Sequence, residues 1–123
     1  MDTYKFVYMV MMHFSRCGTC RRVLEYLDKH STDHHVVHYV THPPSREEWS
    51  NICRKLKMHP RDLLRKDSPI VRMRWGDRNW SDEEWLGVLV RYPQLARRPI
   101  VYGDDWALIA TDPKDLEPYL VNV

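Results

Sequence analysis

Two cysteines separated by two residues stand between segments of opposite periodicity, and this arrangement constrains the fold more than any other feature of the chain. The motif is Cys17-Gly18-Thr19-Cys20. Residues 4–12, which precede it, are rich in aromatic and β-branched types with few breakers, which predicts a buried strand. After Gly18 apolar residues recur at helical spacing, which predicts an amphipathic helix to about Lys29. We therefore expect a strand that leads through a cysteine loop into a helix.

Length and composition narrow the class of protein. The 123 residues fit one domain, so we expect residues 1–123 to form a single one. Hydrophobic residues make up 43% and charged residues 29%, which is typical of a globular protein. A formal net charge of +2 is too small for a general nucleic-acid binder. No apolar run approaches the ~18 residues that a spanning helix needs, so we expect no membrane segment and a cytoplasmic location.

The remaining elements can be located from their breakers and helix caps. Pro43-Pro44 ends a strand predicted over residues 34–40. Ser45 with Glu48, and Ser81 with Glu84, have the capping-box spacing, which predicts helices over residues 46–57 and 82–91. Between these helices we expect one helical turn over 61–66 and then a polar loop that contains Pro69.

The C-terminal part is predicted to form a hairpin and a last helix. Strands over residues 99–102 and 106–110 flank a turn that begins at Gly103, and Pro113 starts a short helix that ends at Leu120. The order β-α-β, helices, β-β-α is that of a thioredoxin-like fold. We therefore expect an α/β (α+β) protein with a mixed sheet and an inserted helical segment.

The cysteine motif favours thiol redox chemistry. A helix start stabilises a thiolate, and Arg16, Arg21 and Arg22 add positive charge beside Cys17, so Cys17 is the expected nucleophile. A structural zinc site would need a second cysteine pair, which the sequence lacks. For Cys20 the residue pattern leaves two roles open, packing on the helix and resolving a disulfide.

The other metal-like or reactive side chains favour structural roles. Cys53 lies in an amphipathic helix, where core packing is expected. His34, His38 and His42 share one face of a predicted strand but span some 13 Å at roughly 3.3 Å per residue, too far for one metal ion. The tryptophans, four of which are Trp75, Trp80, Trp85 and Trp106, show no spacing of a base-stacking platform.

Four motifs together resemble the ArsC arsenate reductases and their Spx-type relatives. They are, in chain order, His13-x-x-x-Cys17-Gly18-Thr19-Cys20-Arg21, His38-Tyr39-Val40-Thr41-His42-Pro43-Pro44-Ser45-Arg46-Glu47-Glu48, Leu63-Leu64-Arg65-Lys66 and Arg97-Arg98-Pro99-Ile100-Val101. The resemblance implies a thioredoxin-like fold with an inserted helical segment. It also implies a nucleophilic Cys17, oxyanion-binding arginines at Arg65 and Arg98, and a cis peptide bond before Pro99.

The resemblance further implies a thiol-dependent oxidoreductase of the glutaredoxin-dependent arsenate reductase type. Arg65, Arg98 and the loop residues Gly18 and Thr19 would hold arsenate, and Pro99 would orient the Arg98 backbone. From the residues themselves, the charge of Arg16 would tune Cys17, and His13 either tunes the thiolate or only ends the strand. No bound cofactor is expected, since glutathione or glutaredoxin would supply the electrons. Cys20 offers a second route, because a disulfide with Cys17 would suit a thioredoxin-type reductant. We expect a monomer.

Two other functions remain open at this stage. The ArsC reductases usually have serine where this chain has Cys20, whereas the Spx-type regulators have a second cysteine. The ArsC reductases also tend to have an arginine at the position where this chain has Asp112. These two features favour a redox-sensing regulator that binds RNA polymerase, whereas Leu63-Leu64-Arg65-Lys66 is the signature of the reductases. A generic glutathione or disulfide reductase is the third reading.

Overall fold

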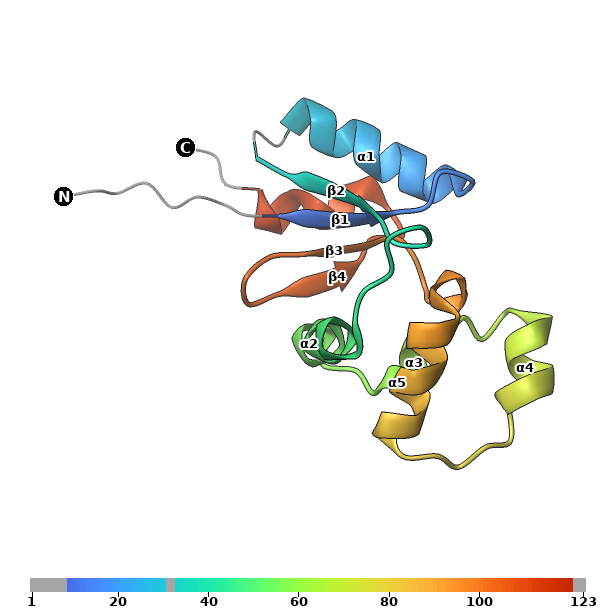
Figure 1. Cartoon of the computed structure of the whole chain (residues 1–123). Coiled ribbons are helices and arrows are strands. Elements are labelled where there is room, and N and C mark those ends of the chain that lie inside the picture. Colours follow the sequence, from blue (N-terminus) through green and yellow to red (C-terminus); the bar gives the residue numbers. More distant parts are fainter. Residues whose placement is uncertain (1–8, 31–32, 121–123) are drawn as a thin grey trace. The chain divides into compact units, whose positions relative to one another are not determined.

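The computed structural model describes residues 9–30 and 33–120, and the chain divides into two compact units (Figure 1). Unit 1 is formed by Met1–His38 and Arg98–Val123, and unit 2 by Tyr39–Arg97. Unit 2 is thus an insertion in the sequence of unit 1. The single domain over residues 1–123 stays a prediction.

Unit 1 contains a mixed four-stranded sheet, as the sequence predicts. Its strands are β1 (Val10–His13), β2 (His35–His38), β3 (Ile100–Tyr102) and β4 (Ala107–Ile109), in the order β2-β1-β3-β4. β1 pairs with β2 in parallel, while β3 is antiparallel to both β1 and β4. A parallel pair needs a crossover, which the helix α1 (Gly18–His30) provides.

The core of unit 1 lies between the sheet and α1. Cys20, Val23 and Leu27 recur at helical spacing and are fully buried on α1. They belong to one cluster with Met9 and Met11 at the first strand, and with Val101, Ala110 and Leu116 from the C-terminal part. The buried face of α1 therefore fixes the start of the helix, and the cysteine loop with it, against the sheet.

The strand boundaries differ from the prediction by one or two residues, and β2, β3 and β4 are each shorter than expected. β1 ends at His13, one residue later than expected, and residues 4–8 of the predicted strand lie outside the described residues. β2 ends at His38 rather than at Val40. The reason is the register, because His13 pairs with His38 and β1 offers no further partner beyond that point.

Unit 2 is helical throughout its described elements. They are α2 (Arg46–Leu56), α3 (Pro60–Leu63), α4 (Pro69–Trp75), α5 (Asp82–Arg91) and the 3-10 turn η1 (Pro93–Leu95). Both predicted capping boxes are present, at Ser45 and at Ser81. The helices α2, α3 and α5 pack on one another, with Trp49, Leu63 and Leu89 among the fully buried side chains.

The prediction was wrong in two helical segments. The expected polar loop at Pro69 is the helix α4, because proline suits the first helical turn and Val71 and Trp75 then fall four residues apart on one buried face. The last helix is the 3-10 helix η2 (Pro113–Tyr119) rather than an α-helix. Pro118 lies inside it and has no N–H to donate to an α-helical hydrogen bond.

Candidate active site

The cysteine loop joins the end of β1 to the start of α1 and holds Cys17 just before the first helical residue. The Cys17 N–H donates to the carbonyl of Phe14 at 3.0 Å, which closes the loop. The Cys20 N–H donates to the Cys17 sulfur at 3.3 Å. One of the N–H groups of the first helical turn, which have no partner within the helix, is therefore directed at the sulfur, as expected for a thiolate site.

These contacts lower the pKa of Cys17. Burial by itself raises the pKa of Cys17, but the backbone N–H of Cys20, the thiol of Cys20 and the guanidinium of Arg98 together bring it below the ordinary 9.0. Each of these groups stabilises the negatively charged sulfur rather than the neutral thiol. The structure thus favours the nucleophilic form of Cys17.

Cys20 lies beside Cys17, but its pKa is raised rather than lowered. Its side chain is completely buried, and burial together with the neighbouring Cys17 raises the pKa of Cys20 to about 12. Both cysteines are free thiols in this structure. Cys20 therefore keeps its proton, which it can share with the Cys17 sulfur. The buried position fits the packing role, and the contact with Cys17 fits the resolving role, so both remain open.

Arg98 contacts the loop from a position two residues before β3. Its guanidinium carbon lies 4.6 Å from the centre of the Phe14 ring, and its side chain hydrogen-bonds to Cys17. The peptide bond between Arg98 and Pro99 is cis, as the resemblance implies. Phe14 is a residue that sequence reasoning missed, because the contact joins segments far apart in the chain and no local signal marks it. A cation over an aromatic ring is held in place, so Phe14 positions Arg98 beside the sulfur.

His13 is buried at the end of β1. It is 5% exposed, its ring meets that of His38 edge-on at 5.5 Å between centroids, and its Nδ1 has no hydrogen-bond partner among the described residues. Burial, followed by the charges of His38 and Arg21, lowers the pKa of His13 below 6.5. His13 is therefore neutral around pH 7, and its role in tuning Cys17 stays a prediction.

The comparison with known proteins assigns the family. Residues 12–118 match the ArsC family. The chain belongs to the ArsC family. It is 30% identical over 94 residues to an arsenate reductase of Acidiphilium multivorum, a match that covers 76% of this chain and 67% of the relative. It is 32% identical over 94 residues to an arsenate reductase of Rhizobium meliloti, with the same coverage.

The structural comparison agrees with this assignment. The solved structure of an arsenate reductase from Vibrio cholerae superposes with a TM-score of 0.85 at 24% identity, over 94% of this chain and 100% of that one. The likeness confirms the predicted thioredoxin-like architecture of this ArsC-family chain.

Arg65, the other arginine that the ArsC resemblance singles out, lies in unit 2. Its backbone N–H donates to the carbonyl of Leu95 at 2.9 Å, next to a bridge between Leu64 and Ala96. Its Nη2 lies 3.5 Å from the Oδ2 of Asp67, and about a third of its side chain is exposed. An anion that binds Arg65 would compete with Asp67. The oxyanion role of Arg65 stays a prediction.

Three further residues of the ArsC-type site lie in the loop and the first helical turn. Gly18 and Thr19 are the first residues of α1, and the Thr19 hydroxyl accepts a hydrogen bond of 3.1 Å from Arg22. Arg16 is exposed in the turn before Cys17. Burial raises the pKa of Cys17, and the groups that lower it are Cys20 and Arg98 rather than these three residues. The proposed roles of Gly18, Thr19 and Arg16 stay predictions.

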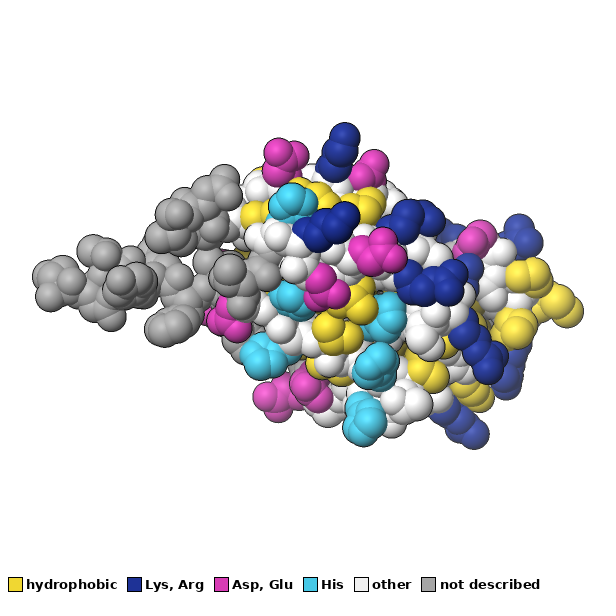
Figure 2. Space-filling model, turned by 90° about the horizontal axis from the view of Figure 1, so that it is seen from above, with side chains coloured by type: hydrophobic (Ala, Val, Ile, Leu, Met, Phe, Trp, Pro, Cys, Tyr) yellow, Lys and Arg dark blue, Asp and Glu magenta, His cyan; other side chains and the backbone are white. Residues whose placement is uncertain are grey.

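Metal binding and membrane insertion find no support in the described residues. Figure 2 shows several histidine side chains on the surface of the molecule. In residues 9–30 and 33–120, however, no group of three or more His, Cys, Asp or Glu side chains is arranged to hold a metal ion. None of the helices in this part of the chain has the length and apolar character required to cross a membrane.

Proposed function

We propose that this ArsC-family chain is a thiol-dependent arsenate reductase in which Cys17 is the nucleophile. One observation carries the proposal: the Cys17 sulfur is held at the start of α1 by the Cys20 N–H and lies within hydrogen-bond reach of Arg98. An N–H donor and a guanidinium stabilise a thiolate and attract an anionic substrate to the same place. The arsenate reductases among its relatives indicate the oxyanion.

In the proposed binding step, arsenate is held by charge-assisted hydrogen bonds. Arg98 supplies a planar pair of donors beside the sulfur, and the first residues of α1, Gly18 and Thr19, supply backbone N–H groups at the positive end of the helix. Arg65 is proposed as the second oxyanion-binding arginine on the ArsC resemblance alone. Phe14 keeps Arg98 in the orientation that this binding requires.

The proposed chemistry begins with nucleophilic attack. The Cys17 thiolate forms a bond to arsenic, and one arsenate oxygen leaves as water after protonation. A thiol then attacks the Cys17 sulfur, the sulfur–arsenic bond breaks, and its electron pair stays on arsenic. Arsenic is thereby reduced from the +5 to the +3 state, and two thiols are oxidised to one disulfide. Glutathione is the attacking thiol in the first version, which leaves a mixed disulfide for glutaredoxin to reduce.

Cys20 provides a second version of the reduction step. Its thiol already contacts the Cys17 sulfur, so it can attack that sulfur once arsenic is bound and close an intramolecular disulfide. Its raised pKa means that it must first lose its proton, for which the departing arsenic oxygens are acceptors. A thioredoxin-type protein would then reduce the Cys17–Cys20 disulfide.

The same contact favours a second candidate function. A pair of cysteines that can close a disulfide is also a redox switch, as in a regulator of the Spx type that binds RNA polymerase. In that case oxidation, rather than arsenate, would be the signal. A general glutathione or disulfide reductase would use the same two thiols without binding arsenate.

An arsenite-formation assay tests the proposal. The purified protein is given arsenate with glutathione and glutaredoxin, or with a thioredoxin system. Cys17→Ser should abolish turnover with both systems. Arg98→Ala and Arg65→Ala should weaken arsenate binding by about 1.5–3 kcal/mol, because each removes a charge-assisted hydrogen bond. Arg54→Ala, an exposed arginine on α2, is the matched control and should change nothing.

The reductant separates the two versions of the mechanism. Cys20→Ser should leave glutathione-dependent turnover intact and abolish the thioredoxin-dependent route. If no arsenite forms with either system and arsenate does not bind, arsenate reduction is excluded. Reversible closure of the disulfide in such a protein would then leave the regulator or the general reductase.

A further inference from the structure

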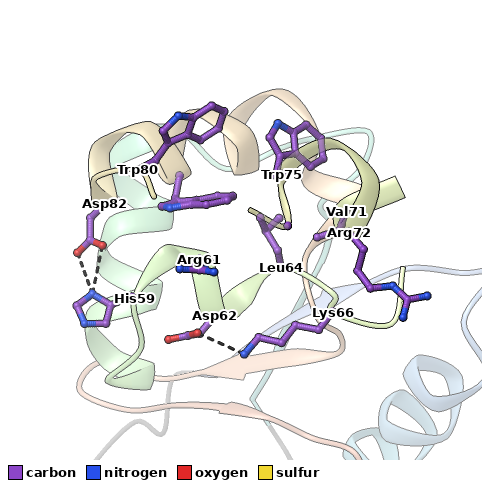
Figure 3. A pocket seen from close by; sticks show the side chains of 12 residues that line it. His59, Arg61, Asp62, Leu64, Lys66, Val71, Arg72, Trp75, Trp80 and Asp82 are labelled. Atoms are coloured by element: carbon purple, nitrogen blue, oxygen red, sulfur yellow. Dashed lines mark hydrogen bonds and ion pairs between the residues drawn. The ribbon is translucent and has the colours of Figure 1, made fainter. Parts of the chain in front are cut away.

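Unit 2 contains a cavity that the thiol chemistry does not use. It has a volume of about 610 Å³ and lies among α3, α4, α5 and the loops between them (Figure 3). A volume of this size is within the ~300–1,000 Å³ range of small-molecule sites. Three tryptophans, every fifth residue along the sequence, line it: Trp75, Trp80 and Trp85.

The walls of the cavity are aromatic and well fixed. Trp75 is 8% and Trp85 3% exposed, while Trp80 is half-buried, and the rings of Trp80 and Trp85 lie 5.1 Å apart at 53°. Leu64 and Val71 add apolar surface between them. Figure 3 shows Trp75 and Trp80 along one side of the cavity. Such walls accommodate a flat apolar ring by stacking or by edge-to-face contact.

The opposite side of the cavity carries positive charge (Figure 3). Lys66 and Asp62 are paired at 3.5 Å, and His59 and Asp82 at 3.1 Å, so both carboxylates of the lining already have partners. The Arg61 guanidinium lies 5.8 Å from the centre of the Trp85 ring.

Arg61 and Arg72, the two arginines of the lining, form no ion pair within residues 9–30 and 33–120. The lining therefore has unmatched positive charge next to its aromatic walls. An anionic group of a ligand would supply the missing partner.

We propose that this cavity binds a small organic anion that combines a flat aromatic ring with a carboxylate or phosphate group. The ring would lie against Trp75 and Trp80, and the anionic group would face Arg61. The two kinds of contact recognise different parts of one ligand, which gives the cavity its selectivity. The inference goes beyond the proposed function, because it involves neither the cysteines nor Arg98.

Ligand titrations followed by NMR test the proposal on the full chain. Naphthalene-2-carboxylate and adenosine monophosphate are the probes with ring and charge, and they distinguish a carboxylate from a nucleotide ligand. 2-Naphthylmethanol has the ring alone, and inorganic phosphate has the charge alone. Naphthalene-2-carboxylate, adenosine monophosphate or both should bind. The affinity of 2-naphthylmethanol and of inorganic phosphate should be lower by roughly tenfold or more, because the first lacks the charge-assisted contact and the second lacks the stacking.

The five indole N–H resonances locate the binding. Those of Trp75, Trp80 and Trp85 should shift, while those of Trp49 and Trp106, which do not line the cavity, should not. Arg61→Gln should lower the affinity for the ring-containing charged probe by roughly tenfold. Arg54→Gln removes the same charge at an exposed position outside the cavity and should leave the affinity unchanged.

Two results would overturn the proposal. One is equal affinity for the charged and the neutral naphthyl probes. The other is an equal loss for Arg61→Gln and Arg54→Gln, which would mean that only the overall charge matters. Trp80→Leu is a second variant for the aromatic wall and should weaken the binding of every ring-containing probe that the wild type binds. Cys17 alkylation in these variants should match the wild type, so that a failure here is distinguishable from a failure of the thiol site.

Discussion

Replacing Arg98 by glutamine should raise the pKa of Cys17 by about one unit. A hydrogen bond to a charged group contributes about 1.5–3 kcal/mol, and the lower end applies here because Arg98 is partly exposed. One pKa unit corresponds to about 1.36 kcal/mol, so the loss of this contact predicts a shift of that size. Glutamine keeps a donor and much of the volume but removes the positive charge.

The expected change in reactivity follows from the same shift. Below both pKa values the thiolate fraction falls about tenfold per unit, but the more basic thiolate is a better nucleophile by a factor of about three. The alkylation rate of Cys17 should therefore fall about threefold, and the midpoint of its pH profile should rise by one unit. Iodoacetamide labelling between pH 5 and 9.5, with Cys17 located by peptide mass spectrometry, measures both quantities.

The other two cysteines, Cys20 and Cys53, do not titrate between pH 5 and 9.5. Burial raises the pKa of Cys20 to about 12, and burial with the charge of Asp82 raises the pKa of Cys53 to about 11. Lys29→Gln is the control, since it removes an exposed positive charge from the last turn of α1, away from the cysteine loop. An unchanged Cys17 profile in Arg98→Gln, or an equal shift in Lys29→Gln, would refute the view that Arg98 acts by direct contact with the sulfur.

Three further outcomes are expected. Mild oxidation should give a monomer that has lost two hydrogens and carries a Cys17–Cys20 linked peptide, and finding only glutathionylated Cys17 would mean that Cys20 is structural. The free energy of unfolding, measured with urea, should decrease as the pH falls below 6.5. The reason is that His13 in the unfolded chain then binds a proton, whereas folded His13, with its lowered pKa, does not. His13→Gln should reduce this loss of stability. Ser45→Ala should lower the free energy of unfolding by about 1 kcal/mol, because it removes the oxygen that accepts the Glu48 N–H at 3.1 Å, while exposed Ser50→Ala should have little effect.

The fold could be predicted from the sequence wherever local signals agree. The two capping boxes place the starts of α2 and α5, and the change from strand to helical period places α1. α4 was missed because Pro69 follows a polar stretch and was read as a breaker, whereas the buried side chains of Val71 and Trp75 make it a first-turn residue of a helix. The end of β2 was misplaced since it depends on the partner strand rather than on its own residues.

The candidate site could be predicted from the sequence only where local signals mark it. Cys17 at a helix start can be read from the sequence, and the structure supplies the N–H contact that this position implies. Phe14 beneath Arg98 could not be read, because it is a contact between distant segments. The spacing of the three tryptophans of the cavity does not show that they are close in space, and only the fold of unit 2 brings them around one cavity.

The division of the chain into two units places most of its tryptophans in one unit and its two neighbouring cysteine thiols in the other. Trp49, Trp75, Trp80 and Trp85 belong to unit 2, and of the five tryptophans only Trp106 belongs to unit 1, which also holds the Cys17 and Cys20 thiols. During denaturation the tryptophan fluorescence should report mainly the melting of the inserted unit. Labelling of the buried Cys20 should report the opening of unit 1, without any engineered probe. Coincident midpoints in urea would establish one cooperative folding unit, whereas an earlier fluorescence transition would show that the insertion melts while the thiol site is still folded.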